Sequence, residues 1–166
     1  MDRYVERLVK CNASPAGIAG MVAGVILTVA GAILLISILP QFAILFLVAG
    51  IALFVFSKDQ TELEYEYILT NGDIEISKII SKKRRKLVRN IVADSITLMD
   101  RAEAERTKND ISIGKYSVKK YVGKEPDTVV ALYTGEGAKQ EIILVDFNED
   151  CIDHMKQTIK NKCNIT

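Results

Sequence analysis

The chain has 166 residues with 22 basic and 21 acidic side chains, which gives a formal net charge of +1. This composition excludes a collagen-like, a disulfide-rich and a wholly disordered chain. The charges are unevenly spread, because residues 11–57 carry none and about 35% of residues 58–166 are charged. The sequence therefore predicts a membrane segment followed by a soluble one.

Residues 1–15 are predicted to form an amphipathic N-terminal segment. Between residues 3 and 10, pairs of apolar side chains alternate with charged ones, a spacing that favours a short amphipathic helix. Such a helix would lie on the membrane surface ahead of the apolar block. Residues 12–15 provide a break and a new helix start.

Residues 16–57 are predicted to form a transmembrane helical hairpin. One bilayer crossing needs about 20 apolar residues, so the uncharged run of 47 residues is too long for one span. Proline disrupts helical hydrogen bonding, which places the break at Pro40 and gives spans over 16–39 and 41–57. A secretory signal peptide is excluded, because its apolar core has about 7–15 residues and a cleavage site would have to follow.

Basic side chains flank the hairpin at its two outer ends. Arg3, Arg7 and Lys10 precede the first span, whereas Lys58 and the run 82–86 follow the second. Positively charged flanks favour the cytoplasmic side, so both termini and a domain over residues 58–166 are expected there. The sequence thus predicts a multi-pass protein of the cell membrane.

The first span carries many small residues, among them Gly20 and Gly24 in a GxxxG pair that lets two helix backbones approach closely. Two interpretations remain open. The pair packs against the second span near Ala49 and Gly50, or it joins two copies of the chain into a homo-oligomer.

Over residues 62–67 glutamates alternate with apolar or aromatic side chains, and Leu69 continues the apolar face, which is typical of a strand with one buried face. Asn71-Gly72 follows, and both residue types tolerate positive φ, so a tight turn should join this strand to one over residues 73–80. Apolar residues would then meet across the pair.

Further strands are predicted at residues 87–92, 95–99, 127–134 and 139–146, with a weaker one within 111–117 and a solvated loop or short helical turn at 101–110. Asn148 suits the N-cap of a closing helix. Four of its residues share an apolar face: Ile152, Met155, Ile159 and Cys163. The predicted fold class is an N-terminal transmembrane α-helical hairpin plus an α+β, mainly-β domain, a seven-stranded barrel or sandwich capped by a C-terminal helix.

Four stretches carry a resemblance to a known family: residues 1–9, residues 64–76, the basic run 82–86 and Phe147-Asn148-Glu149. In these the chain resembles an uncharacterised bacterial family of small proteins with two membrane spans and a cytosolic pleckstrin-homology-like (PH-like) domain. The order of seven strands and a C-terminal helix also resembles the PH fold. These motifs are structural, so the resemblance implies a fold and no activity.

Six basic residues fall within eight positions between two predicted strands: Lys82, Lys83, Arg84, Arg85, Lys86 and Arg89. Each basic group near an anionic membrane adds about 1 kcal/mol of attraction, so one interpretation is contact with membrane lipids, anionic lipids in particular. A solvated loop that protects an edge strand and contact with an acidic protein partner remain open. Nucleic acid is not expected, because residues 58–166 hold as many acidic as basic groups.

Residues with catalytic or cofactor chemistry are sparse. The single histidine, His154, is expected on the surface of the closing helix, no His/Cys spacing suits a metal, and no phosphate-binding glycine loop is found. Cys11, Cys151 and Cys163 are expected to be reduced thiols. No catalytic, cofactor-binding or metal-binding residue is predicted.

These features predict a non-enzymatic integral membrane protein that presents a PH-like interaction or scaffolding domain at the cytoplasmic membrane surface. The alternative is an oligomeric membrane assembly or a transport-accessory subunit regulated by its cytosolic domain. The identity of the protein partner is open.

Overall fold

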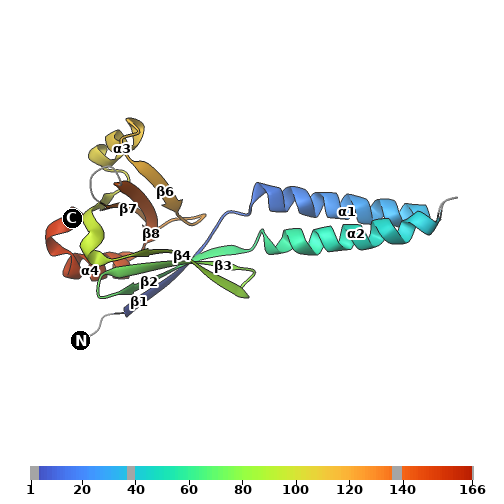
Figure 1. Cartoon of the computed structure of the whole chain (residues 1–166), viewed down its shortest axis with the longest axis horizontal. Coiled ribbons are helices and arrows are strands. Elements are labelled where there is room, and N and C mark those ends of the chain that lie inside the picture. Colours follow the sequence, from blue (N-terminus) through green and yellow to red (C-terminus); the bar gives the residue numbers. More distant parts are fainter. Residues whose placement is uncertain (1–3, 37–39, 136–139, 166) are drawn as a thin grey trace. The chain divides into compact units, whose positions relative to one another are not determined.

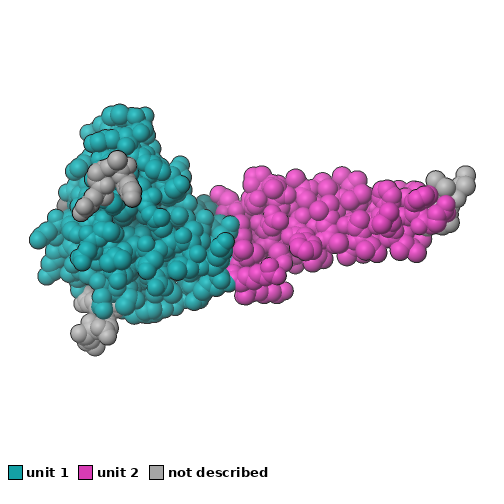
Figure 2. Space-filling view, in the orientation of Figure 1, with its two compact units in different colours: residues 1–11, 64–79, 85–166 teal, residues 12–63, 80–84 magenta. Residues whose placement is uncertain are grey.

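The computed structural model describes residues 4–36, 40–135 and 140–165 and divides into two compact units. Unit 1 comprises residues 1–11, 64–79 and 85–166, and unit 2 comprises residues 12–63 and 80–84 (Figure 2). The chain therefore leaves unit 1 after its first strand, forms most of unit 2, and then returns to unit 1.

Unit 2 is built on two apolar helices, α1 (Pro15–Leu35) and α2 (Pro40–Asp59), which run side by side (Figure 1). Both are long and apolar enough to cross a membrane. The first ends earlier than its predicted span, and the predicted end at 37–39 lies outside the described residues. Pro40 is the first residue of α2 and not a break between the helices. Proline is tolerated there because the backbone N–H that it lacks would have no hydrogen-bond partner in the first turn of a helix.

Unit 1 contains two sheets of four strands each, except for the strand-end residues Leu63, Ile80 and Arg84, which belong to unit 2. Sheet A has the order β1-β2-β3-β4 and sheet B the order β5-β7-β8-β6. The strands of sheet A are β1 (Tyr4–Lys10), β2 (Leu63–Thr70), β3 (Asp73–Ile80) and β4 (Arg84–Ile91). Those of sheet B are β5 (Ile96–Arg101), β6 (Ser117–Tyr121), β7 (Thr128–Thr134) and β8 (Glu141–Phe147). The sequence predicts a seven-stranded barrel or sandwich; the single seven-stranded barrel is wrong, because the described residues form two four-stranded sheets.

The N-terminal segment is a strand, so the predicted amphipathic helix is wrong for residues 4–10. β1 pairs antiparallel with β2, from Tyr4 opposite Thr70 to Lys10 opposite Glu64. Its side chains alternate between exposed and shielded positions, with Val9 buried. A spacing that also suits a helix becomes a strand here because β2, more than fifty residues later, supplies the backbone partners.

The predicted hairpin around Asn71-Gly72 is confirmed. β2 ends at Thr70, β3 begins at Asp73, and the two turn residues have φ values of 51° and 94°. A Cβ atom at Gly72 would lie 2.5 Å from Cγ2 of Thr158, so the position requires glycine for space as well as for conformation.

Sheet B is covered on one face by α3 (Glu105–Ser112), which begins in the segment 101–110 predicted to be a loop or a short helical turn and ends two residues beyond it. A small apolar cluster lies on that face, and Ile111 of α3 packs against it. The weak strand predicted within 111–117 is displaced, since β6 begins only at Ser117 and pairs in parallel with β8. Each face of sheet B thus has its own apolar cluster.

The main core joins the two sheets and the closing helix α4 (Glu149–Thr158). Asn148 caps α4 as predicted, because its Oδ1 accepts a hydrogen bond of 3.1 Å from the Cys151 amide. Ile152, Met155 and Ile159 are buried. Cys163 is not on this helix, since it follows the short 3-10 helix η3 (Lys160–Lys162). Its backbone forms an isolated parallel β-bridge with Met99 of β5.

Candidate functional site

The six basic residues predicted as one contact surface lie on a turn and on a strand. Lys82 and Lys83 occupy the turn between β3 and β4, and the other four lie on β4: Arg84, Arg85, Lys86 and Arg89. β4 is an edge strand of sheet A, and seven of its eight residues are exposed or half-exposed.

Ion pairs divide these six residues into two groups. Arg85 pairs with Glu66 of β2, and Arg89 pairs with Glu141 of β8. Lys82, Lys83, Arg84 and Lys86 are exposed and form no ion pair with any residue that the structure describes. The sequence did not separate the groups, because the two acidic partners come from strands distant in the chain.

Glu66 was expected on the exposed face of its strand, yet only 1% of it is exposed. Burial raises the pKa of its carboxyl above the ordinary value, the Arg85 guanidinium opposes that rise, and the Glu6 carboxyl on β1 adds to it. Arg85 therefore stabilises the buried Glu66 carboxylate within sheet A, and its charge is partly neutralised by this ion pair.

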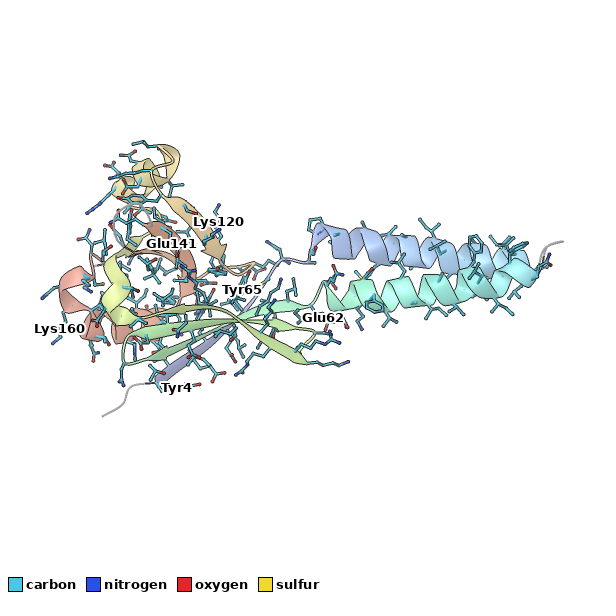
Figure 3. The ribbon with its side chains drawn as sticks, in the orientation of Figure 1. Tyr4, Glu62, Tyr65, Lys120, Glu141 and Lys160 are labelled. Carbon is cyan, nitrogen blue, oxygen red and sulfur yellow. The ribbon has the colours of Figure 1, made fainter. Side chains whose placement is uncertain are left out.

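The turn that carries Lys82 and Lys83 is fastened to the end of α2. The Ser81 hydroxyl donates to Oδ1 of Asp59 at 2.9 Å, and the Ser81 amide donates to the carbonyl of Glu62 at 2.7 Å. Figure 3 labels Glu62, just beyond the end of α2. The turn itself closes through the Lys83 amide and the Ile80 carbonyl at 3.1 Å.

The charge of the chain differs between the two units. Unit 2 carries four basic side chains, Lys58, Lys82, Lys83 and Arg84, and two acidic ones, Asp59 and Glu62. The remaining 18 basic and 19 acidic residues belong to unit 1. The small positive excess of the chain therefore resides in the helical unit.

Gly20 and Gly24 lie in the seam between α1 and α2 of the same chain. A Cβ atom at Gly24 would lie 2.7 Å from the Phe54 nitrogen and 2.9 Å from the Gly50 oxygen. A Cβ atom at Gly20 would lie 2.9 Å from Cβ of Ser57. The close approach that a GxxxG pair permits is thus used within the hairpin.

An ion network that was not among the predicted sites ties β1 to the rest of unit 1. Arg7 donates to Oδ1 of Asp146 at 2.8 Å and to Oδ2 of Asp127 at 2.7 Å. The Asp146 side chain is fully buried, and that of Arg7 is 12% exposed. A sequence signal existed, because Arg7 has the same parity as Val5 and Val9 and so shares the inward face of a strand.

His154 is buried, so its predicted surface position is wrong. It is 2% exposed, and its Nε2 accepts a hydrogen bond of 3.3 Å from the Gly72 amide. α4 buries a broader face than its apolar residues indicate, since Cys151 is buried beside it. Burial raises the pKa of the Cys151 thiol to about 11, and the three cysteines are free thiols.

Within residues 4–36, 40–135 and 140–165, no group of three or more His, Cys, Asp or Glu side chains is arranged to hold a metal ion. A cavity of about 510 Å³ lies where the β2–β3 turn meets the end of α4. Its lining includes Asn71, Asp94, Lys160 and Lys162, which are polar or charged side chains.

The sequence profile of one protein family, described as "Bacterial PH-like domain (DUF6106)", matches residues 1–165. No curated protein and no solved structure matches the chain. PH-like domains are generally non-catalytic and suggest an interaction or scaffolding role. With two sheets, a closing helix and a match over nearly its whole length, the chain belongs to this bacterial PH-like family.

Proposed function

We propose that this protein is a non-enzymatic membrane anchor for an interaction domain. Its two apolar helices cross the cell membrane as a hairpin, and unit 1 is presented to protein partners on the cytoplasmic side. The PH-like family supports the interaction role. The hairpin and its orientation rest on the observations that follow.

The sides of α1 and α2 are apolar and exposed. Only 11% and 17% of the residues in their most apolar stretches are buried, whereas a core helix of a soluble protein would be mostly buried. Large apolar side chains more than half exposed include Ile26 and Ile33 of α1 and Ile44, Leu45 and Phe56 of α2. Lipid acyl chains would cover such a surface without any further protein.

The pairing of β1 with β2 is the observation that carries the proposed topology. Lys10, five residues before α1, lies opposite Glu64, five residues after α2. Strands that share backbone hydrogen bonds must lie on the same side of a membrane, so a hairpin inserted between them has to cross it an even number of times. The basic side chains at that end of the hairpin favour the cytoplasmic side.

Cysteine labelling in intact bacterial cells tests this topology. We would introduce Ile36→Cys, at the end of α1, and Glu125→Cys, an exposed position in unit 1, with Cys11 and Cys163 replaced by Ser. A membrane-impermeant maleimide should label the Ile36→Cys protein in intact cells. The Glu125→Cys protein should react only after the membrane is permeabilised.

The background protein without introduced cysteines is the control, because Cys151 is fully buried. Labelling of the Glu125→Cys protein in intact cells would place unit 1 outside and contradict the orientation. Recovery of the protein in the soluble fraction after lysis would contradict the membrane anchor itself.

The alternative of an oligomeric assembly or transport-accessory subunit depended on Gly20 and Gly24 facing another copy. Packing of both glycines within the hairpin accounts for their presence without a second chain. We therefore retain the anchored interaction domain as the proposed function.

A further inference from the structure

Four basic side chains of unit 2 gather at one end of its helical hairpin: Lys58, Lys82, Lys83 and Arg84, here called the hairpin-end basic cluster. We infer that this cluster binds the phosphate headgroups of anionic lipids. The inference rests on the proposed function, since it takes the hairpin to cross a membrane, and it names the lipid class that the protein would select.

The position of the cluster is fixed within unit 2. Gly17, near the start of α1, is buried, and a Cβ atom there would lie 3.0 Å from Cγ2 of Thr61, just after α2. This contact marks the end of the hairpin at which the chain enters α1 and leaves α2. Ser81 is bound to Asp59 at that same end, so Lys82 and Lys83 are held at the level where headgroups would meet the helices.

The two tight turns of sheet A differ in the residue types that occupy their positive-φ positions. The β2–β3 turn uses Asn71-Gly72, whose types tolerate positive φ. The β3–β4 turn places Ser81 and Lys82 at φ values of 52° and 55°, a region that L-residues with long side chains rarely adopt. Ser81 gains its bond to Asp59, whereas the Lys82 side chain forms no ion pair with any residue that the structure describes.

Protection of an edge strand does not account for these lysines. Charged residues that prevent edge pairing lie on the strand itself, as Arg85 and Arg89 do. Lys82 and Lys83 precede β4, which begins at Arg84. The cluster outnumbers its acidic neighbours in unit 2 by four to two, and one of these acids, Asp59, already accepts a hydrogen bond from Ser81.

A lipid surface fits the cluster better than an acidic protein does, because the same unit carries the exposed apolar sides of α1 and α2. A lipid can cover both features, because its acyl chains would contact the apolar sides of the helices and its phosphate would contact the basic cluster at their end. Lysine and arginine near an anionic leaflet each strengthen binding about fivefold, so three of them together are expected to account for about a hundredfold.

Lipid titration of the full chain in neutral detergent tests the inference, with bound lipid counted by native mass spectrometry. The probes are dioleoylphosphatidylglycerol and dioleoylphosphatidylcholine. The test variant combines Lys82→Asn, Lys83→Gln and Arg84→Gln, in which asparagine keeps a residue tolerant of positive φ in the turn. We expect the wild-type chain to prefer phosphatidylglycerol and the variant to lose that preference by about a hundredfold.

A matched control removes three exposed positive charges from unit 1 through Lys119→Gln, Lys120→Gln and Lys124→Gln. This control should keep the wild-type preference. An equal loss in the control, an unchanged preference in the test variant, or a wild-type chain without preference would each overturn the inference. Polyglutamate is the probe for an acidic protein partner. A test variant that loses polyglutamate binding but keeps its phosphatidylglycerol preference would assign the cluster to such a partner instead.

The same proteins are then separated into membrane and soluble fractions after expression. Because the titration is done in detergent, it decides the lipid inference wherever the chain is found. Loss of lipid preference with full membrane retention would be the expected result for the test variant, whereas a wild-type chain in the soluble fraction would contradict the proposed function alone.

Discussion

Arg7 and Asp146 are 139 residues apart in the chain, and their side chains meet at 2.8 Å in the interior of unit 1. A charged group removed from water is stable only when it is paired and hydrogen-bonded. The fully buried Asp146 therefore depends on Arg7, which in turn holds β1 against β8. Asp127 also contacts Arg7, but its side chain is 64% exposed.

Replacement of Arg7 should destabilise unit 1 strongly. We expect Arg7→Met to lower the free energy of unfolding by about 3–5 kcal/mol, because the Asp146 carboxylate would remain buried without a countercharge. The control Asp127→Asn removes an exposed partner and should cost about 0–1 kcal/mol. Urea denaturation of the detergent-solubilised chain, followed by tyrosine fluorescence, measures both. Similar losses in the two variants would contradict this account.

Glu66 should make the stability of unit 1 depend on pH in the weakly acidic range. Since burial raises the pKa of its carboxyl in the folded state, the folded chain binds the proton more tightly than the unfolded chain does. Stability should therefore fall as pH rises from the ordinary carboxyl pKa through the raised one. Glu66→Gln, which is neutral at every pH, should remove this part of the decline.

Thermal unfolding of the wild type, of Glu66→Gln and of Glu75→Gln, measured between about pH 4 and about pH 7, checks the Glu66 prediction. Glu75 is the control because it lies exposed on the neighbouring strand β3. A Glu66→Gln profile with the same slope as the wild type would show that the carboxyl titrates alike in the folded and unfolded chain.

At the scale of elements, glycine decides how α1 meets α2. Gly24 and Gly50 face each other, and a Cβ atom at Gly50 would lie 2.6 Å from the Thr28 nitrogen. Since the atoms in the way belong to helix backbones, a larger residue can be accommodated only if the helices move apart. The seam therefore sets the separation of the two helices.

Gly24→Val should separate the helices and lower the stability of the hairpin by about 1–3 kcal/mol, the usual cost of overpacking. Ala19→Val is the control, because Ala19 is exposed on the same helix. Resistance to unfolding by SDS in mixed micelles measures the effect, and crosslinking reports the oligomeric state. A variant that keeps the hairpin but loses an oligomer would favour the interpretation in which this face joins two chains.

At the scale of the whole molecule, the helical hairpin is an insertion into a domain. β1 and β2 would form an ordinary β-hairpin if the chain between Lys10 and Glu64 were short, because these residues lie opposite each other. The predicted boundary at residue 58 therefore leaves out one strand of sheet A. It also leaves out Arg7, the countercharge of Asp146.

We expect a chain in which a short Asn-Gly turn replaces residues 11–63 to fold without detergent. The fragment 58–166 should be unfolded or aggregated, since it exposes the edge of β2 and the uncompensated Asp146. Circular dichroism and analytical ultracentrifugation compare the two proteins. A fragment as stable as the shortened chain would show that β1 contributes nothing to unit 1.

Elements with local signals could be predicted from the sequence. The Asn71-Gly72 turn and the Asn148 cap depend on conformations and hydrogen bonds within a few residues, and the two apolar helices depend on composition. β1 and β6 could not be placed, because short strands are stabilised by partners distant in the chain. The basic run is visible in the sequence as one cluster. Which of its residues form ion pairs depends on Glu66 and Glu141, which only the folded structure brings next to Arg85 and Arg89.

The sequence by itself determined that a long uncharged block precedes a charged domain, and which local turns and caps shape that domain, because hydropathy and backbone preference act between near neighbours. The tertiary structure alone decided that the domain begins before the hairpin, that His154 and Glu66 are buried, and that Arg85 and Arg89 pair with distant acids while the other four basic residues stay exposed without an ion pair among the described residues. Each of these depends on which distant strands and helices come together. Their packing decides which charged side chains are buried and paired and which remain exposed to solvent.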